Sequence, residues 1–143
     1  MKANMYKWIN MFLGVILSLL GYSCRDHMLM YGTPTAEFDL KGQVTNEAKQ
    51  PLPNMQIVHT TGYKDGAGNM YWSEYPDTLF TDAEGKFYRL YHNTMREHML
   101  IASDPARVYA SDTVVATVTY TGGDGAWYDG HADLNVDFVL KEK

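Results

Sequence analysis

The sequence predicts an all-β fold, an antiparallel sandwich of about seven strands that follows an N-terminal signal peptide. Two observations carry the prediction of the fold. Apolar and polar residues alternate with a period of two through most of residues 35–140, as they do in half-buried strands. Turn residues separate the alternating segments at short intervals, and no segment has the apolar stripe of an amphipathic helix.

Composition bounds the class of protein. The chain has 143 residues, of which 45% are hydrophobic and 13% aromatic, and this is too apolar for a disordered chain. The formal net charge is -5, and no Lys/Arg-rich stripe interrupts it, so a nucleic-acid partner is excluded. The single cysteine, Cys24, excludes an internal disulfide.

The N-terminus has the order of a secretory signal. MKANMYK carries two lysines and no acid, residues 11–20 are almost wholly apolar, and GYSC follows. The apolar run is shorter than the roughly 20 residues that a membrane-spanning helix needs. A signal that ends in cysteine resembles the lipobox of bacterial lipoproteins, and this implies that Cys24 is lipidated and holds the protein to a membrane. An ordinary cleaved signal and an uncleaved anchor are the alternatives.

We therefore divide the chain into a signal peptide over residues 1–23, a lipidated N-terminus and tether over 24–34, and a β-sandwich over 35–143. The first strand covers residues 36–45, with Glu37, Asp39 and Lys41 on its polar face. A proline-containing turn then leads to a strand over residues 55–59. Residues 62–77 contain three glycines and no regular period, which predicts a long exposed loop.

The sequence after residue 77 predicts five more strands. Residues 78–80 lead into a hairpin over 81–91, in which Asp82 begins the turn and Gly85 takes the position of positive φ. Short strands follow over residues 98–102 and 112–121, and a glycine-rich turn then precedes the last strand. This strand covers residues 131–141, and its inward residues are Ala132, Leu134, Val136, Phe138 and Leu140.

Two segments resemble the carboxypeptidase-regulatory-like domain. These are GQVTNEAKQPLPNMQI, over residues 42–57, and TDAEGKFYRL, over residues 81–90. The resemblance implies a transthyretin-like, Ig-like sandwich of seven strands. The whole layout is similar to a set of small Gram-negative proteins named radical-SAM-associated lipoproteins, through the cysteine-terminated signal, the MYGTPTAEFDLKG segment, the TDAEGKF hairpin and the GGDGAWYDG turn.

No pattern of catalytic or metal-binding residues stands out. The five histidines form no metal-binding motif, and we expect them to be structural or exposed. Asp124, Asp129 and Asp133 do not have the spacing of a calcium-binding loop. No nucleophile elbow is present. We therefore expect no catalytic residue, no metal site and no cofactor.

Aromatic side chains are the remaining candidates for ligand or partner contacts. They are Tyr71, Trp72 and Tyr75 in the predicted long loop, and Trp127 and Tyr128 near the last turn. On exposed loops they could stack on a glycan or anchor an envelope protein. The alternative is that they fold back over the open ends of the sandwich as minor core.

These observations predict a non-enzymatic lipoprotein of the cell envelope, a binding or assembly module presented from the membrane. The family resemblance implies the outer membrane, with the periplasmic face favoured over the cell surface. Two other functions stay open: a substrate or accessory of a radical-SAM maturation system, and a carbohydrate-binding module that uses the loop aromatics. An enzyme is the least favoured class.

Overall fold

The computed structural model describes Met11 and residues 33–143. The chain divides into two compact units, and the second, Thr33–Lys143, contains the whole β-structure. Cys24, almost all of the predicted signal peptide and most of the predicted tether fall outside the described residues, so the structure does not bear on them. No described helix is long and apolar enough to cross a membrane.

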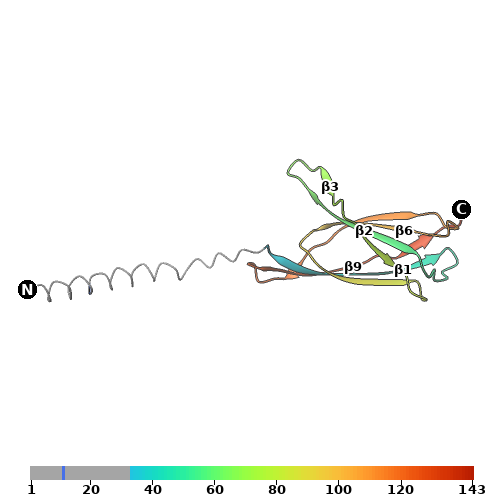
Figure 1. Cartoon of the computed structure of the whole chain (residues 1–143), viewed down its shortest axis with the longest axis horizontal. Coiled ribbons are helices and arrows are strands. Elements are labelled where there is room, and N and C mark those ends of the chain that lie inside the picture. Colours follow the sequence, from blue (N-terminus) through green and yellow to red (C-terminus); the bar gives the residue numbers. More distant parts are fainter. Residues whose placement is uncertain (1–10, 12–32) are drawn as a thin grey trace, which may run out of the picture. The chain divides into compact units, whose positions relative to one another are not determined.

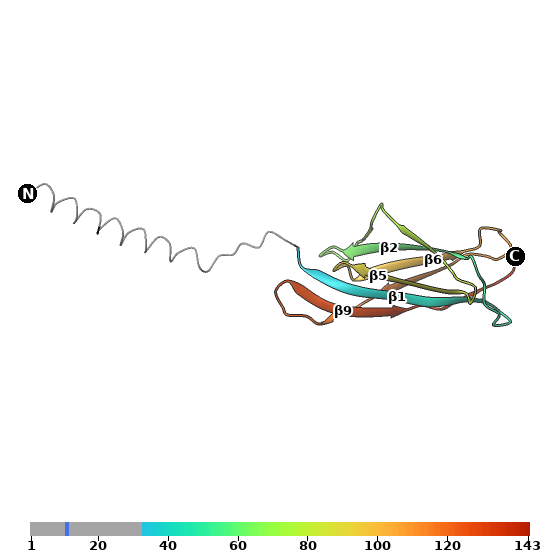
Figure 2. The same ribbon diagram turned by 60° about the horizontal axis from the view of Figure 1, so that its bottom comes forward.

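The described domain consists of two five-stranded sheets (Figure 1). In the first sheet, β1 lies at the centre, with β5 on one side and β9, β10 and the short β8 on the other. The bounds of these strands are β1 Thr35–Asn46, β5 Lys86–His92, β8 Thr121–Gly122, β9 Tyr128–Asn135 and β10 Phe138–Leu140. The turned view in Figure 2 shows β1 running beside β9 and β5 along the length of this sheet.

The second sheet is built on β2 and β6. β2 pairs with β6 along one side and with β3 and β4 along the other, and β7 pairs with the far side of β6. The bounds are β2 Gln56–Lys64, β3 Met70–Trp72, β4 Asp77–Phe80, β6 Glu97–Ser103 and β7 Asp112–Thr117. The prediction of an almost wholly β domain with two layers is confirmed.

Strand direction differs from the prediction. β1 pairs in parallel with both β9 and β10, and antiparallel only with β5, so the first sheet is mixed. The described chain also has ten strands, and the predicted last strand is two, β9 and β10, separated at Val136 and Asp137. Gly42 lies opposite this break, where a Cβ atom would stand 1.8 Å from the Val136 carbonyl oxygen. Alternation shows which residues point inward, but it does not encode the direction of the partner strand.

The core lies between the two sheets. Phe38, Leu40 and Val44 from β1 meet Ile57 from β2 and Leu100 from β6, all with no exposed surface. The inward face predicted for the last strand is largely confirmed, because Ala132, Val136, Phe138 and Leu140 are buried, while Leu134 is half-buried.

The turn between β4 and β5 carries the chain from one sheet to the other. The Asp82 carboxylate accepts hydrogen bonds from the Glu84 and Lys86 amides. Gly85 has a φ of 71°, as predicted. The turn is present as expected, but the strands on its two sides do not pair with each other. β4 pairs with β2, and β5 pairs with β1.

The segment over residues 62–77 is more regular than the predicted loop. β2 continues to Lys64, and β3 returns against it after a turn in which the Asp65 carboxylate accepts hydrogen bonds from the Ala67 and Asn69 amides. The sequence predicts a loop here because the segment contains three glycines. Gly62 lies within β2 and not in a turn. A glycine is needed there because the Trp72 ring occupies the space that a side chain at residue 62 would fill.

Candidate functional site

The outer face of the first sheet gathers charged side chains from two neighbouring strands. The parallel register of β1 and β9 places Glu37 beside His131 and Asp39 beside Asp133. Residues two apart on a strand share a face, so these four side chains form one patch. Lys41 is next along β1 and forms an ion pair with Asp133.

Asp39, His131 and Asp133 converge on one point. His131 Nε2 lies 3.4 Å from Asp39 Oδ2 and 3.4 Å from Asp133 Oδ2. One potential ligand atom from each residue lies within 4.8 Å of the others. We call these three residues the triad. Its side chains are half-exposed, so a solute ion has direct access.

The second oxygen of each carboxylate is held by a neighbour. The Tyr88 hydroxyl donates to Asp39 Oδ1 at 2.6 Å, and the Lys41 ammonium donates to Asp133 Oδ1 at 3.0 Å. The bond from Lys41 lowers the pKa of Asp133, and the bond to Asp39 raises the pKa of Tyr88. Both Oδ2 atoms are thereby left facing His131.

Glu37 lies on the opposite side of the His131 ring. Its Oε2 atom is 3.9 Å from His131 Nδ1 and accepts a hydrogen bond from the Tyr128 hydroxyl at 3.3 Å. A carboxylate at this ring nitrogen favours the tautomer that carries its proton on Nδ1 and leaves Nε2 free as a ligand atom. The His131 ring therefore lies between Glu37 on its Nδ1 side and the two aspartates, Asp39 and Asp133, on its Nε2 side.

An open groove of about 520 Å³ adjoins the triad. Lys41 and Tyr88, which bond to the triad carboxylates, also line the groove. Gly42, Asn135 and Asp137 line it at the break between β9 and β10. The groove and the triad are thus connected through Lys41 and Tyr88.

A second cluster of titratable side chains lies inside the sandwich. His59 from β2 and His98 from β6 are 2% and 0% exposed, and His59 Nε2 lies 2.9 Å from His98 Nδ1. The Phe38 ring stacks on His98 with the ring centroids 4.2 Å apart. The Tyr91 ring lies against His59, and its hydroxyl donates to Asp77 on β4.

The hydrogen bonds of this pair determine both tautomers. His98 Nε2 lies 3.0 Å from the Met95 carbonyl oxygen, which can only accept, so His98 carries its proton on Nε2. His98 Nδ1 is then an acceptor, and His59 donates to it from Nε2. Burial lowers the pKa of His59 to about 4 and also lowers that of His98. The pair is neutral, bonded and enclosed, and its role is structural.

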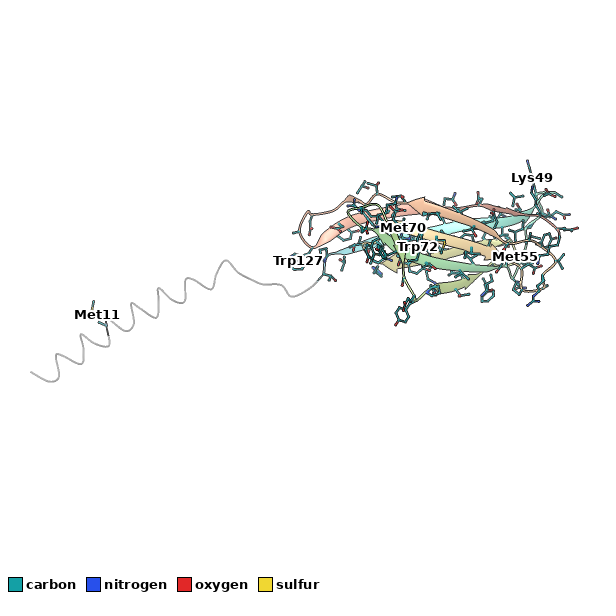
Figure 3. The ribbon with its side chains drawn as sticks, turned by 90° about the horizontal axis from the view of Figure 1, so that it is seen from above. Met11, Lys49, Met55, Met70, Trp72 and Trp127 are labelled. Carbon is teal, nitrogen blue, oxygen red and sulfur yellow. The ribbon has the colours of Figure 1, made fainter. Side chains whose placement is uncertain are left out.

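Tyr71 and Trp72 lie on the hairpin of β2 and β3, Trp127 and Tyr128 on the hairpin of β8 and β9, and Tyr75 between β3 and β4. Figure 3 labels Trp72 and Trp127. Tyr71 stacks on Tyr63 with 47% of its surface exposed, and Tyr75 is 88% exposed. Trp72 packs against Gly62, and Tyr128 bonds to Glu37. Ligand or partner contacts by these side chains, and lipidation of Cys24, stay predictions of the sequence.

The acidic, glycine-rich segment that contains Asp124 forms a tight turn. The Asp124 carboxylate accepts hydrogen bonds from the Ala126, Trp127 and Tyr128 amides, so it closes the hairpin between β8 and β9. Sequence reasoning missed the triad, although it placed Asp39 and Asp133 on outward faces. The available signal was a polar, titratable outer face on both the first and the last long strands.

No family model matches the chain, and no curated protein matches it. Solved structures do share its fold. 3-Chlorocatechol 1,2-dioxygenase from Rhodococcus opacus 1CP is 15% identical with a TM-score of 0.51, over 78% of this chain and 61% of that one. Catechol 1,2-dioxygenase from Pseudomonas arvilla C-1 is 15% identical with a TM-score of 0.52, over 78% of this chain and 54% of that one.

A third example is chlorocatechol 1,2-dioxygenase from Pseudomonas putida, which is 12% identical with a TM-score of 0.51, over 78% of this chain and 68% of that one. The chain thus spans less than two thirds of the length of the first two enzymes. At these identities the likeness is one of fold.

The comparisons correct the sequence interpretation. The identification with radical-SAM-associated lipoproteins and the carboxypeptidase-regulatory-like domain is wrong, because no family model matches and the similar structures are dioxygenases. We expected a non-enzymatic envelope module, with radical-SAM and carbohydrate-binding alternatives. This expectation is overturned, because the solved structures that share the fold are those of enzymes. The outer-membrane location rested on the same resemblance and is wrong with it.

Proposed function

We propose that this domain is a metal-dependent enzyme that binds a divalent transition-metal ion through Asp39, His131 and Asp133. The observation that carries the proposal is the convergence of two carboxylate oxygens on His131 Nε2, each at 3.4 Å. The fold, shared with dioxygenases, supports the enzymatic part.

The spacing of the triad suits a tetrahedral ion. Oxygen and nitrogen ligands bind zinc at about 2.0–2.2 Å, and two such ligands at tetrahedral angles lie about 3.3–3.6 Å apart. The two separations from His131 Nε2 fall in this range. Imidazole with carboxylates suits zinc and iron better than calcium, which prefers six or more oxygens.

Charge and outer contacts fit the same ion. Glu37, Asp39 and Asp133 surround His131, and Lys41 is paired with Asp133, so a divalent cation would balance the remaining two negative charges of these four residues. Metal-binding histidines usually donate their second N–H to a carboxylate, and the carboxylate on that side of the His131 ring is Glu37, with its Oε2 atom 3.9 Å from Nδ1. Tyr88 and Lys41 fix the carboxylates without using the oxygens that face the ion.

Three protein ligands leave a coordination position open, as in catalytic rather than structural zinc sites. A bound ion would supply a Lewis acid there, able to polarise a substrate oxygen or to lower the pKa of water. The groove beside Tyr88 and Lys41 would hold the rest of the substrate. Catechol and 3-chlorocatechol, after which the similar enzymes are named, are the first substrates to assay.

Cobalt(II) titration tests the site directly, because tetrahedral cobalt absorbs strongly in the visible range. We expect one equivalent of Co²⁺ to develop a visible band in the intact protein and Zn²⁺ to displace it. His131→Asn and Asp39→Asn should weaken binding by at least about tenfold, the loss expected even for an outer-contact residue. Glu37→Gln should weaken it by about 10- to 100-fold while keeping the tetrahedral spectrum.

His92→Asn is the matched control. His92 is an exposed histidine on β5 that pairs with Glu37 from the other side of β1, so the variant removes an imidazole from the same face without touching the triad. Unchanged cobalt binding in this variant is expected. A wild-type protein that shows no band, or a His131→Asn variant that binds as tightly as wild type, rules out the site.

A further inference from the structure

The edges of the two sheets differ in how they are protected. An edge strand presents unpaired N–H and C=O groups to any other strand, and proteins usually block such edges with charge or short length. The edge strand β5 carries Lys86, Arg89 and His92, and β8 at the opposite edge is only two residues long. β3 and β4, beside β2, have three and four residues.

β7 lacks this protection. It has six residues, and after Asp112 its sequence TVVAT contains no charge, glycine or proline. Within residues 33–143, the ladder partner of β7 is β6 alone. Val115 is 56% exposed on its outer face, and threonine and valine are good strand formers.

We propose that β7 pairs with β7 of a second copy of this chain, antiparallel and about a two-fold axis at Val115. An axis normal to the sheet keeps the core face of both copies on the same side, so residue 115 meets its own counterpart. Thr113 then lies opposite Thr117, and Val114 opposite Ala116. Threonine–threonine and valine–valine neighbours stabilise antiparallel pairs, and no like charges meet.

The outer face of the second sheet supports the same occupant. The register places Met99 on β6 beside Val115, and Ile101 beside Thr113. Both are half-buried, so an apolar strip reaches the β7 edge and would continue across the axis. The face of the first sheet is charged by contrast, with Glu37, Asp39 and Asp133.

The same operation fails at β5. An antiparallel two-fold axis at the centre of β5 would lie at Arg89 and bring two guanidinium groups, each paired with its own Asp77, opposite each other. Like charges directly opposite one another destabilise a pair of strands. Self-pairing is therefore specific to the β7 edge.

Sedimentation velocity of the full chain tests the proposal. We expect a dimer in the micromolar range that Val115→Lys weakens at least tenfold, because two ammonium groups would meet at the axis. Val139→Lys is the matched control, since Val139 is 52% exposed on β10, and its dimer should persist. Equal far-ultraviolet circular dichroism of both variants shows that they fold.

Disulfide trapping locates the contact. Opposite residues in an antiparallel pair have Cα atoms about 4.5–5.5 Å apart, within the range of a disulfide. In a Cys24→Ser background, Val115→Cys should cross-link under mild oxidation much faster than Val139→Cys. Two results would overturn the proposal. One is a wild-type protein that stays monomeric at about 100 μM, a concentration well above a micromolar dissociation constant. The other is equal cross-linking at residues 115 and 139.

Discussion

The buried pair of His59 and His98 makes stability sensitive to mild acid. Burial lowers the pKa of His59 from 6.5 to about 4, so the folded state stays neutral where the unfolded chain takes up a proton. The stabilisation is complete above pH 6.5 and is lost as the pH falls from about 6.5 toward about 4. A lowering of this size corresponds to about 3 kcal/mol.

We predict that the free energy of unfolding falls by about 3 kcal/mol between pH 7 and pH 4 through this pair. His59→Gln, which keeps an N–H donor for His98 but gains no proton, should flatten the fall. Urea unfolding at several pH values measures it. His92→Gln removes an exposed histidine and should leave the slope as in wild type. A His59→Gln slope equal to that of wild type would contradict the assignment.

At the scale of elements, the turn between β4 and β5 holds β5 against the connection between β1 and β2. The Thr81 hydroxyl donates to the Leu52 carbonyl and accepts from the Met55 amide, both within the buried interior. Gly85 faces the same connection, where an added Cβ would lie 2.6 Å from the Val44 carbonyl oxygen and 2.9 Å from the Leu52 amide nitrogen. Glycine is required here by both conformation and space.

Gly85→Ala should therefore destabilise the domain by about 2 kcal/mol or more, since its φ of 71° already costs an L-residue about 1–2 kcal/mol. Gly66→Ala is the control, because nothing lies within 4 Å of an added Cβ at that position. Its stability should stay within about 0.5 kcal/mol of wild type or rise slightly. Thermal or urea unfolding compares the two, and equal losses would refute the steric explanation.

Strand existence was predictable from the sequence, whereas pairing was not. The alternation around Phe38 and Leu40 marks inward and outward residues, and Asp82 and Gly85 mark a turn. Neither signal states that β5 leaves the sheet of β4, because this depends on contacts between residues far apart in the chain. The hairpin of β2 and β3 was missed because glycine signals in the segment outweighed its short alternating pieces.

At the scale of the whole molecule, Asp77 joins the two sheets. It lies on β4 of the second sheet and accepts hydrogen bonds from Arg89 and Tyr91 on β5 of the first, both at 2.7 Å. Burial alone would raise the pKa of Asp77, but the bonds from Tyr91 and from the Thr78 amide outweigh it, and the pKa is lowered.

Asp77→Ala should cost about 1–2 kcal/mol of stability. The half-buried Tyr91 hydroxyl loses its acceptor, and the more exposed Arg89 pair adds little. Glu47→Ala removes a fully exposed pair with Lys141 at 3.9 Å and should cost less than about 0.5 kcal/mol. Chemical unfolding separates them, and similar costs for both would show that the contact between sheets contributes nothing special.

The triad belongs to this largest scale, which explains why it could not be predicted. Its members come from residue 39 and from residues 131 and 133, and only the parallel register of β1 and β9 brings them together. Before that register is known, Asp39 and Asp133 are indistinguishable from other exposed acids on strands. The pairing of His98 with His59 likewise depends on the register of β2 and β6, which the sequence does not reveal.

That parallel pairing also has a consequence for biosynthesis. The central strand of the first sheet finds β9 and β10 only about 90 residues later, as the separation of 92 residues between Lys41 and Asp133 shows. Ribosomes add roughly 5–20 residues per second, so the edge of β1 that pairs with β9 and β10 stays unpaired for on the order of ten seconds. High contact order of this kind slows folding. Until β9 and β10 have emerged, this edge of the nascent chain presents unpaired N–H and C=O groups with which other strands can pair.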